Sequence, residues 1–176
     1  ELLTMVEEAE IKGGIDEHES KLIRSAIEFN DLDADQILTS RVDMISIPKE
    51  TTMEDVRKVF KENKFSRIPV YENNIDNIIG VIHEKDFYDA LDEKKENIDS
   101  IIKPILYVTS NTKISELLKK FQYIKNHMAV VIDEFGGTMG IITLEDVLEE
   151  LVGEIWDEHD EVVEYFKKLD EGKYNV

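Results

Sequence analysis

Residues 42–152 carry the same pattern twice, about sixty residues apart. Four pairs of matching residues define the period: Phe60 and Phe121, Val70 and Val131, Gly80 and Gly140, Asp86 and Asp146. The first two pairs are 61 positions apart and the last two are 60 apart. The lost residue falls where a turn is expected, and turns tolerate insertions and deletions. A fixed period of this length indicates an internal duplication.

Each copy has the hydrophobic pattern of a βαββα unit. The first copy predicts a strand over 44–48, a helix from Thr51, strands over 67–71 and 78–82, and a helix over about 84–91. The second predicts a strand over 105–108, a helix over about 114–121, a strand over 128–132, a strand ending at Thr143 and a helix carrying Asp146. One unit alone is close to the size at which a core is marginal. We therefore expect an α/β (α+β) fold in which two units pack about a pseudo-two-fold axis.

The remaining chain divides around these units. Residues 1–41 predict an N-terminal helical lead-in, with Asp16 and Glu19 as N-cap and N3 of its second helix. Its apolar face needs a partner, either the following domain or an upstream one. The expected boundaries are 1–41 for the lead-in, 42–92 and 93–152 for the repeats, and 153–176 for an acidic C-terminal exit segment. Trp156 within that segment predicts either a docking patch or part of a solvated acidic helix.

Charge and composition exclude several classes of partner. The net charge is −19, from 40 acidic against 21 basic residues, so a nucleic-acid partner is not expected. The same charge disfavours docking on an anionic membrane, while acidic clusters can attract divalent cations. Cysteine is absent, and no apolar run is long enough to cross a bilayer. Because the chain starts at Glu1 inside a predicted helix, we expect it to be part of a longer protein.

Thr143 and Asp146 allow two interpretations. As N-cap and N3 of a helix they resemble a capping box, which only satisfies free backbone N–H groups. The same geometry also suits a ligand, since a helix N-terminus after a strand attracts phosphate and a carboxylate can accept ribose hydroxyls. The duplication and the flanking strands favour the second interpretation.

Several stretches resemble known families. Residues 66–70, 127–131 and 140–146 resemble the tandem CBS (cystathionine-β-synthase-type) repeat, often called a Bateman module. Residues 37–43, 133–137 and 145–159 resemble the CorC/HlyC family of membrane-anchored magnesium and cobalt transport proteins. The run from Glu145 to His159 is the most specific of these stretches. The resemblance covers the chain to about Glu161.

The resemblance implies a regulatory binding module. Relatives place a transmembrane domain before it and a transporter-associated domain after it, and both would be missing here. The expected module lies at the cytoplasmic face of the membrane, forms a homodimer through its CBS repeats and binds an adenosine nucleotide. That ligand would be ATP or AMP, with Mg²⁺ possible, and its binding would control a membrane-embedded divalent-cation transporter.

The same resemblance places the nucleotide in the cleft between the repeats. The implied site residues are Thr39, Met44, Phe65, Ser66, Arg67, Ile141, Thr143 and Asp146. Asp146 would accept the ribose hydroxyls, Thr143 would approach phosphate or ribose, and Arg67 would supply charge for phosphate. Thr39 and Met44 would border the adenine. No protein metal site is expected, because His83 and His127 have no second His or Cys at ligand spacing.

Repeat one departs from this pattern. His83 occupies the position that corresponds to Thr143, although Asp86 is retained. We therefore expect one nucleotide site per chain, built on repeat two, and a poor or empty site at Asp86.

Two other functions remain open on sequence alone. An enzyme is disfavoured, because the chain has no Walker-type glycine-rich loop, no cysteine and no G-x-S-x-G elbow. A structural dimerisation module with no physiological nucleotide is the alternative, because repeat one is degenerate.

Overall fold

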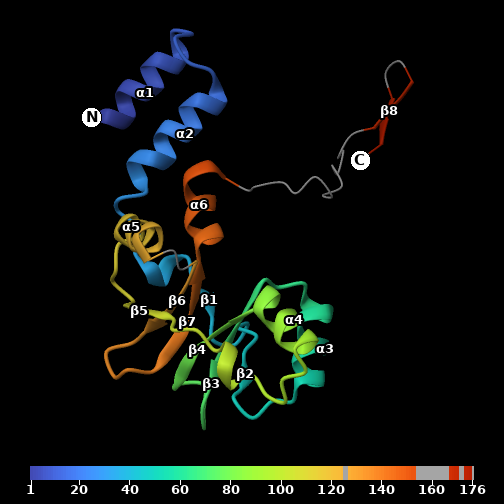
Figure 1. The fold of residues 1–176 in the computed structure, drawn as a ribbon. Coiled ribbons are helices and arrows are strands. Elements are labelled where there is room, and N and C mark those ends of the chain that lie inside the picture. The colour runs from blue at the N-terminus through green and yellow to red at the C-terminus, as the bar shows by residue number, and fades with distance from the viewer. Residues whose placement is uncertain (125–126, 154–166, 171–172, 176) are drawn as a thin grey trace.

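The computed structural model describes residues 1–124, 127–153, 167–170 and 173–175 (Figure 1). Its helices are α1 (Leu2–Ile11), α2 (Glu17–Glu28), η1 (Ala34–Gln36), α3 (Met53–Asn63), α4 (Glu84–Asp92), η2 (Asp99–Ile101), α5 (Ile114–Ile124) and α6 (Leu144–Val152). Its strands are β1 (Thr39–Ser40), β2 (Ile47–Pro48), β3 (Arg67–Tyr71), β4 (Ile78–His83), β5 (Leu106–Thr109), β6 (Met128–Ile132), β7 (Thr138–Thr143), β8 (Lys167–Asp170) and β9 (Lys173–Asn175).

The two predicted units are present, each with one sheet. Repeat one has the order β2-β3-β4, and repeat two has the order β1-β7-β6-β5. Within each unit the first strand is parallel to the second and the last two strands are antiparallel. The predicted α/β fold is thus confirmed, but the strand predicted over 44–48 was too long, because only Ile47–Pro48 pairs.

Each sheet borrows backbone from the other half of the chain. β1 precedes repeat one in sequence, yet it pairs with β7, where Thr39 lies opposite Ile141. In the same way Lys103, just before β5, forms a bridge with Val81 of β4. The borrowed strands lie close to glycines: a Cβ on Gly140 would press on the Thr39 carbonyl oxygen. A Cβ on Gly80 would likewise press on the Lys103 carbonyl oxygen. Each half of the chain therefore contributes a segment to the other half's sheet in the same way.

Three groups of buried side chains hold these parts together. One lies within repeat one around Phe60 and Phe87, and a second lies within repeat two around Phe121. The third takes residues from both repeats: Met44, Ile78, Val81, Met128, Val130 and Ile141. This shared group joins the two sheets, as expected for units that cannot bury enough apolar surface alone.

The lead-in forms a helical hairpin that rests on repeat two. α2 begins with the predicted capping box, in which Asp16 accepts from the Glu19 backbone and Glu19 accepts from the Asp16 backbone. Figure 1 shows α1 and α2 at the α6 end of the molecule, far from α3 and α4, and α2 contacts α6. The described helices include none that is both long and apolar enough to span a membrane.

The exit segment is described only in part. Trp156 and the acidic residues from Asp157 to Glu161 lie outside the described residues, so the predictions made for them are not tested. Within the described residues of this segment, β8 and β9 pair in antiparallel fashion.

Candidate functional site

A cavity of about 280 Å³ lies where the two repeats meet. Its lining comes from both repeats: Thr39, Asp43, Met44, Ile45, Phe65, Arg67, Pro69, Met128, Ile141, Thr143 and Asp146. Met44, Met128 and Ile141 also belong to the shared core, so one wall of the cavity is rigid and apolar. The volume lies just below the usual range for small-molecule sites, roughly 300–1,000 Å³.

Seven of the eight residues predicted for the site line this cavity. Phe65 is 43% exposed, so it is a wall of the cavity and not a core residue. Ser66 is the exception, because it is exposed and does not line the cavity. Its carbonyl oxygen instead accepts a hydrogen bond from the Glu84 N–H at 3.0 Å, at the start of α4.

Thr143 and Asp146 form the capping box that starts α6. The Thr143 hydroxyl accepts from the Asp146 N–H at 3.2 Å. Asp146 Oδ2 accepts from the Thr143 N–H at 2.6 Å and from the Thr143 hydroxyl at 2.7 Å. Neither of the two bonds to the carboxylate uses Oδ1. The pair therefore caps the helix and also leaves one carboxylate oxygen for a donor in the cavity.

Arg67 supplies positive charge at the cavity wall. It is the first residue of β3, and its side chain is only 20% exposed. Arg67 Nη2 lies 3.2 Å from His127 Nδ1, and a guanidinium can only donate, so His127 accepts through Nδ1 in this contact. Arg67 Nη1 is 4.0 Å from Glu145 Oε1. Among the described residues, the buried Arg67 Nε finds no hydrogen-bond partner, so this cation has donor capacity left over.

The cavity depends on the length of the segment that leads into each repeat, which we call the approach segment. Thr39 pairs with Ile141 and Lys103 pairs with Val81, so these two residues are equivalent. In the first strand of each repeat, Ile47 pairs with Val70 and Val108 pairs with Val131. Because Val70 and Val131 are equivalent in the duplication, Ile47 and Val108 are equivalent too. The approach segment therefore has eight steps in repeat one (39–47) and five in repeat two (103–108). The three additional residues form a turn, closed by a hydrogen bond of 2.9 Å from the Asp43 N–H to the Ser40 carbonyl, beside the cavity.

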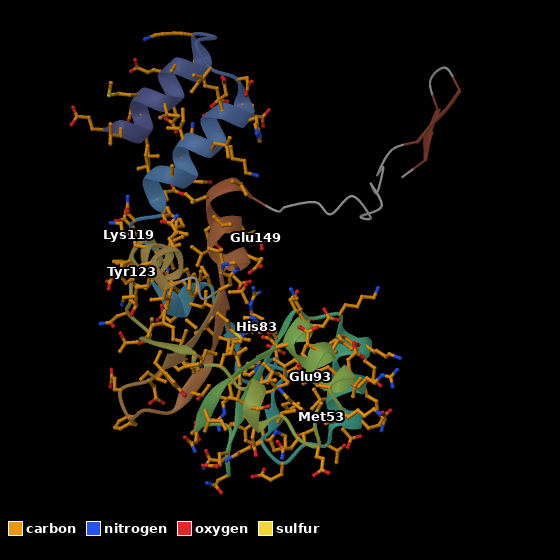
Figure 2. All side chains as sticks on the ribbon, in the orientation of Figure 1. Met53, His83, Glu93, Lys119, Tyr123 and Glu149 are labelled. Atoms are coloured by element: carbon orange, nitrogen blue, oxygen red, sulfur yellow. The ribbon has the colours of Figure 1, made fainter. Side chains whose placement is uncertain are left out.

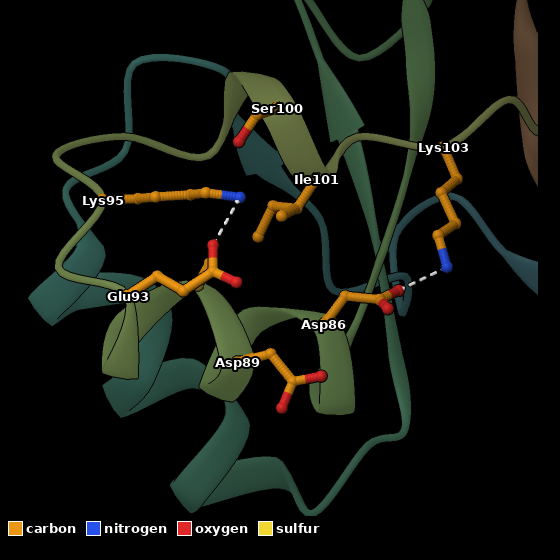
Figure 3. Close-up of a pocket in the computed structure, with 8 residues that line it drawn as sticks. Asp86, Asp89, Glu93, Lys95, Ser100, Ile101 and Lys103 are labelled. Atoms are coloured by element: carbon orange, nitrogen blue, oxygen red, sulfur yellow. Dashed lines mark ion pairs between the residues drawn. The ribbon is translucent and has the colours of Figure 1, made fainter.

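The corresponding aspartate in repeat one is neutralised by the chain itself. Lys103 Nζ lies 2.6 Å from Asp86 Oδ2, and His83 Nδ1 lies 3.9 Å from the same oxygen. Figure 3 shows this ion pair beside a second one, Lys95 with Glu93 at 3.0 Å, around a smaller cavity of about 190 Å³. Two ion pairs therefore engage the carboxylates of Asp86 and Glu93 in this cavity, whereas Asp89, which also lines it, has no ion pair within the described part of the chain.

His83 replaces the hydroxyl of Thr143 with a ring, and makes no side-chain capping bond at the start of α4. It lies between the two halves of the molecule, as Figure 2 shows. Burial lowers the pKa of His83 below its usual value of 6.5, and the positive charges of Lys103 and Arg67 lower it further, against the opposing effect of Asp86. The ring is therefore mainly neutral at neutral pH, and it adds bulk without charge.

The structure shows three features that the sequence did not predict. Asp43 lines the cavity, the approach segment of repeat one contains a turn, and Lys103 holds Asp86. The length difference becomes visible only through the pairings of Thr39 with Ile141 and of Lys103 with Val81, which the sequence does not show. In the described part of the chain, no group of three His, Cys, Asp or Glu residues is arranged to hold a metal ion.

Comparison with known proteins finds the same module. The CBS domain family matches residues 34–93 and 97–153. Hemolysin C of Brachyspira hyodysenteriae is 41% identical, over 91% of this chain and 59% of the relative. The chain spans between 28% and 59% of the length of the first curated relatives that it matches.

Two solved structures are similar along most of the chain. The CBS domain of the bacterial CNNM/CorC family Mg²⁺ transporter is 42% identical with a TM-score of 0.82, and covers 89% of this chain and 96% of its own. A structure of that domain in complex with ATP is 43% identical with a TM-score of 0.73, and covers 78% and 99% respectively.

Proposed function

The chain belongs to the CBS domain family, as the tandem CBS module of the CorC/hemolysin C group, and on that premise we propose that it is a nucleotide-sensing regulatory module. Its ligand is an adenosine nucleotide, ATP or AMP. Binding changes the packing of the two repeats, and that change controls a membrane-embedded divalent-cation transporter. A ligand can do this only if its affinity differs between two arrangements of the repeats.

One observation carries the proposal: a single cavity between the repeats brings together an acceptor for ribose, a cation for phosphate and apolar walls for a base. Asp146 offers Oδ1, Arg67 supplies positive charge in the lining, and Met44, Phe65, Met128 and Ile141 supply the walls. The cavity is about the right size for the nucleoside, with the phosphates at its mouth. The relative solved with ATP supports the choice of ligand.

Mg²⁺ enters the proposal as a companion of the phosphates. The described residues offer no three-residue metal site, so in this proposal the ion arrives with the phosphates. A chain with a net charge of −19 disfavours a bare triphosphate, and a bound Mg²⁺ would offset part of that repulsion.

Calorimetric titration with ATP and AMP tests the proposal, with two matched variants. We expect one site per chain, and Asp146→Ala should weaken binding by about 10- to 100-fold, because hydrogen bonds to charged groups contribute about 1.5–3 kcal/mol. Asp86→Ala removes the equivalent carboxylate from repeat one and should leave the affinity within about twofold. Two equivalent sites, or equal losses in both variants, would contradict the proposal.

A structural dimerisation module is the second candidate. The observation in its favour is the closed capping box, because Thr143 and Asp146 already satisfy one another without a ligand. In that case neither nucleotide would shift the melting temperature of the wild-type chain. Asp146→Ala would then reduce the free energy of unfolding only through the lost cap, by about 1 kcal/mol.

The remaining parts of the proposal concern the whole protein. The module pairs with a second copy through its CBS repeats, lies at the cytoplasmic face of the membrane, and joins a transmembrane domain and a C-terminal transporter-associated domain. It binds nucleotide without turning it over, so a phosphate-release assay with saturating ATP should show no activity above the buffer rate.

A further inference from the structure

The turn between β3 and β4 carries a carboxylate that reaches across to the other repeat. This carboxylate belongs to Asp76, whose N–H donates to Asn74 Oδ1 at 2.9 Å. The ends of the turn are joined by the Glu72 N–H, which donates to the Asn77 carbonyl at 3.0 Å. Repeat one therefore holds the backbone of Asp76 in place, although the proposed function gives this residue no role.

Both oxygens of Asp76 accept hydrogen bonds from the half of the molecule that contains β1 and β7. Oδ1 accepts from the N–H of the buried Thr138 at 3.0 Å, and Oδ2 accepts from Arg41 Nη2 at 3.0 Å. Arg41 Nη1 also donates to Oδ1, so guanidinium and carboxylate form a bidentate pair. These bonds, first from Arg41 and then from Thr138, lower the pKa of Asp76 below its usual value. We call Arg41, Asp76 and Thr138 the clamp.

The clamp holds one wall of the nucleotide cavity. Arg41 lies in the turn of the approach segment, two residues after Thr39 and two before Asp43, and both of these neighbours line the cavity. The Arg41 N–H donates to the Met139 carbonyl at 2.8 Å, which ties this turn to β7. β7 in turn brings Ile141 to the same cavity.

The opposite wall belongs to repeat one. Phe65, Arg67 and Pro69 line it, and β3 connects them to the turn that carries Asp76. The clamp therefore joins the two walls by side-chain bonds, in addition to the shared apolar core beneath them. Preformed walls lower the cost of ordering the site when a ligand binds.

The matching turn of repeat two uses its aspartate differently. Asp133 Oδ1 accepts from the N–H groups of Phe135 and Gly137, each at 2.8 Å, and so braces its own turn. The approach segment of repeat two is also three residues shorter, and the turn that presents Arg41 belongs to the longer one. The clamp thus accompanies the larger cavity.

We infer that Asp76 is a positioning residue for the nucleotide: through Arg41 and Thr138 it fixes one wall of the cavity relative to the other, and so couples affinity to the packing of the repeats. This inference rests on the proposed function, because it assumes a nucleotide in the cavity. The side chains of Arg41 and Asp76 are 40% and 42% exposed, so the pair adds little to stability and can open without unfolding.

The test is calorimetry with AMP on Asp76→Ala, Arg41→Ala and the double variant. By charge alone, loss of Asp76 should strengthen the binding of an anionic ligand and loss of Arg41 should weaken it. The clamp instead predicts that both substitutions weaken binding, each by about fivefold, because both release the same turn. The double variant should bind no more weakly than either single variant, since the two residues act as a unit. Uncharged adenosine should show the same losses.

The matched control is Glu72→Ala, which removes a negative charge from the same turn. Glu72 pairs with Lys49 of repeat one at 3.1 Å, and the two side chains are 38% and 40% exposed. Its loss should leave the AMP affinity within about twofold. Asp76→Asn keeps an acceptor for the Thr138 N–H, so its affinity should lie between those of wild type and Asp76→Ala, and it carries the test if Asp76→Ala does not fold.

Amide hydrogen exchange without nucleotide gives a second readout. The N–H groups of Arg41 and Asp43 should exchange faster in Asp76→Ala than in wild type or Glu72→Ala. Unchanged exchange, an AMP affinity in Asp76→Ala equal to or tighter than that of wild type, or additive losses in the double variant would overturn the inference and leave the proposed function standing. A wild-type chain that binds neither AMP nor ATP would overturn both.

Discussion

The turns that begin α4 and α6 share a backbone but differ in how the aspartate is held. In repeat two, Met128 lies opposite Thr143 across the strands, and Asp146 is held by a hydroxyl and an N–H. In repeat one the equivalent pair is Arg67 and His83, and the carboxylate of Asp86 is held by the ammonium of Lys103. A carboxylate paired with an internal cation has lost most of its attraction for a ligand.

The second difference is the space beside each aspartate. The longer approach segment of repeat one gives the cavity at Asp146 four lining residues, Thr39, Asp43, Met44 and Ile45. The shorter segment of repeat two places Lys103 directly on Asp86. Duplication thus supplied two equivalent scaffolds, and three additional residues in one connection distinguish the cavity at Asp146 from the smaller cavity at Asp86.

The largest expected effect is on stability, and it tests the close contact between a glycine and a segment from the other half of the chain, which both repeats share. Gly140→Ala and Gly80→Ala would each place a methyl group against a borrowed strand, with Leu38 Cδ1 2.8 Å and Ile102 Cγ2 2.6 Å from the new carbon. Because backbone must move in both, each should lose about 3 kcal/mol of unfolding free energy. Urea denaturation measures this loss. Calorimetry then separates the halves: Gly140→Ala displaces Thr39 and should weaken nucleotide binding, while Gly80→Ala should not.

A double substitution sharpens the comparison. In His83→Thr/Lys103→Thr the first repeat receives the polar residues found at the equivalent positions, 143 and 39. The new cap adds about 1 kcal/mol and the lost ion pair removes less than about 1 kcal/mol, so stability should barely change. The stoichiometry measured by calorimetry should remain one, since the approach segment is still three residues short. A second site of similar affinity would show that side chains alone, and not the connection, set the asymmetry.

The smallest expected effect is on pH dependence. Because burial and nearby cations lower the pKa of His83 in the folded state, the unfolded chain binds the proton more readily. Stability from this group is complete above the unfolded pKa of about 6.5 and is lost as the pH falls below it. Repeat two has threonine at this position and no such loss. Chemical denaturation from about pH 7.5 to about pH 5.5 should show a steeper decline for wild type than for His83→Thr, in which the other histidines are unchanged. Parallel curves would contradict this.

The sequence predicted the parts of the fold that repeat or that have strong local signals. The period located both glycines and both aspartates, and the N-cap and N3 pairs located the starts of α2 and α6. β1 was missed because a strand of two residues has no periodicity, and its partner β7 lies about a hundred residues away. The prediction that it formed part of a lead-in ending at residue 41 was based on helical pattern alone.

The sequence predicted some residues of the cavity but not others. Seven of the eight predicted residues line one cavity, because their strands and helix termini followed from the repeat, and their role in binding a ligand remains a prediction. Ser66 lies next to Arg67 in sequence, but it precedes β3 in a bend, where it is exposed and does not line the cavity. Asp43 and Lys103 could not be assigned, since both belong to irregular connections whose shape depends on tertiary contacts.

Because β1 pairs with β7 and Lys103 pairs with β4, the chain resembles two single-repeat proteins that have exchanged their first segments, as in a domain swap. Cutting the chain between residues 96 and 97 would leave one fragment carrying β1, which belongs to the other fragment's sheet, and that other fragment carrying Lys103, which pairs with β4. Each piece would need its counterpart to complete a sheet, so the two halves must assemble together or not at all.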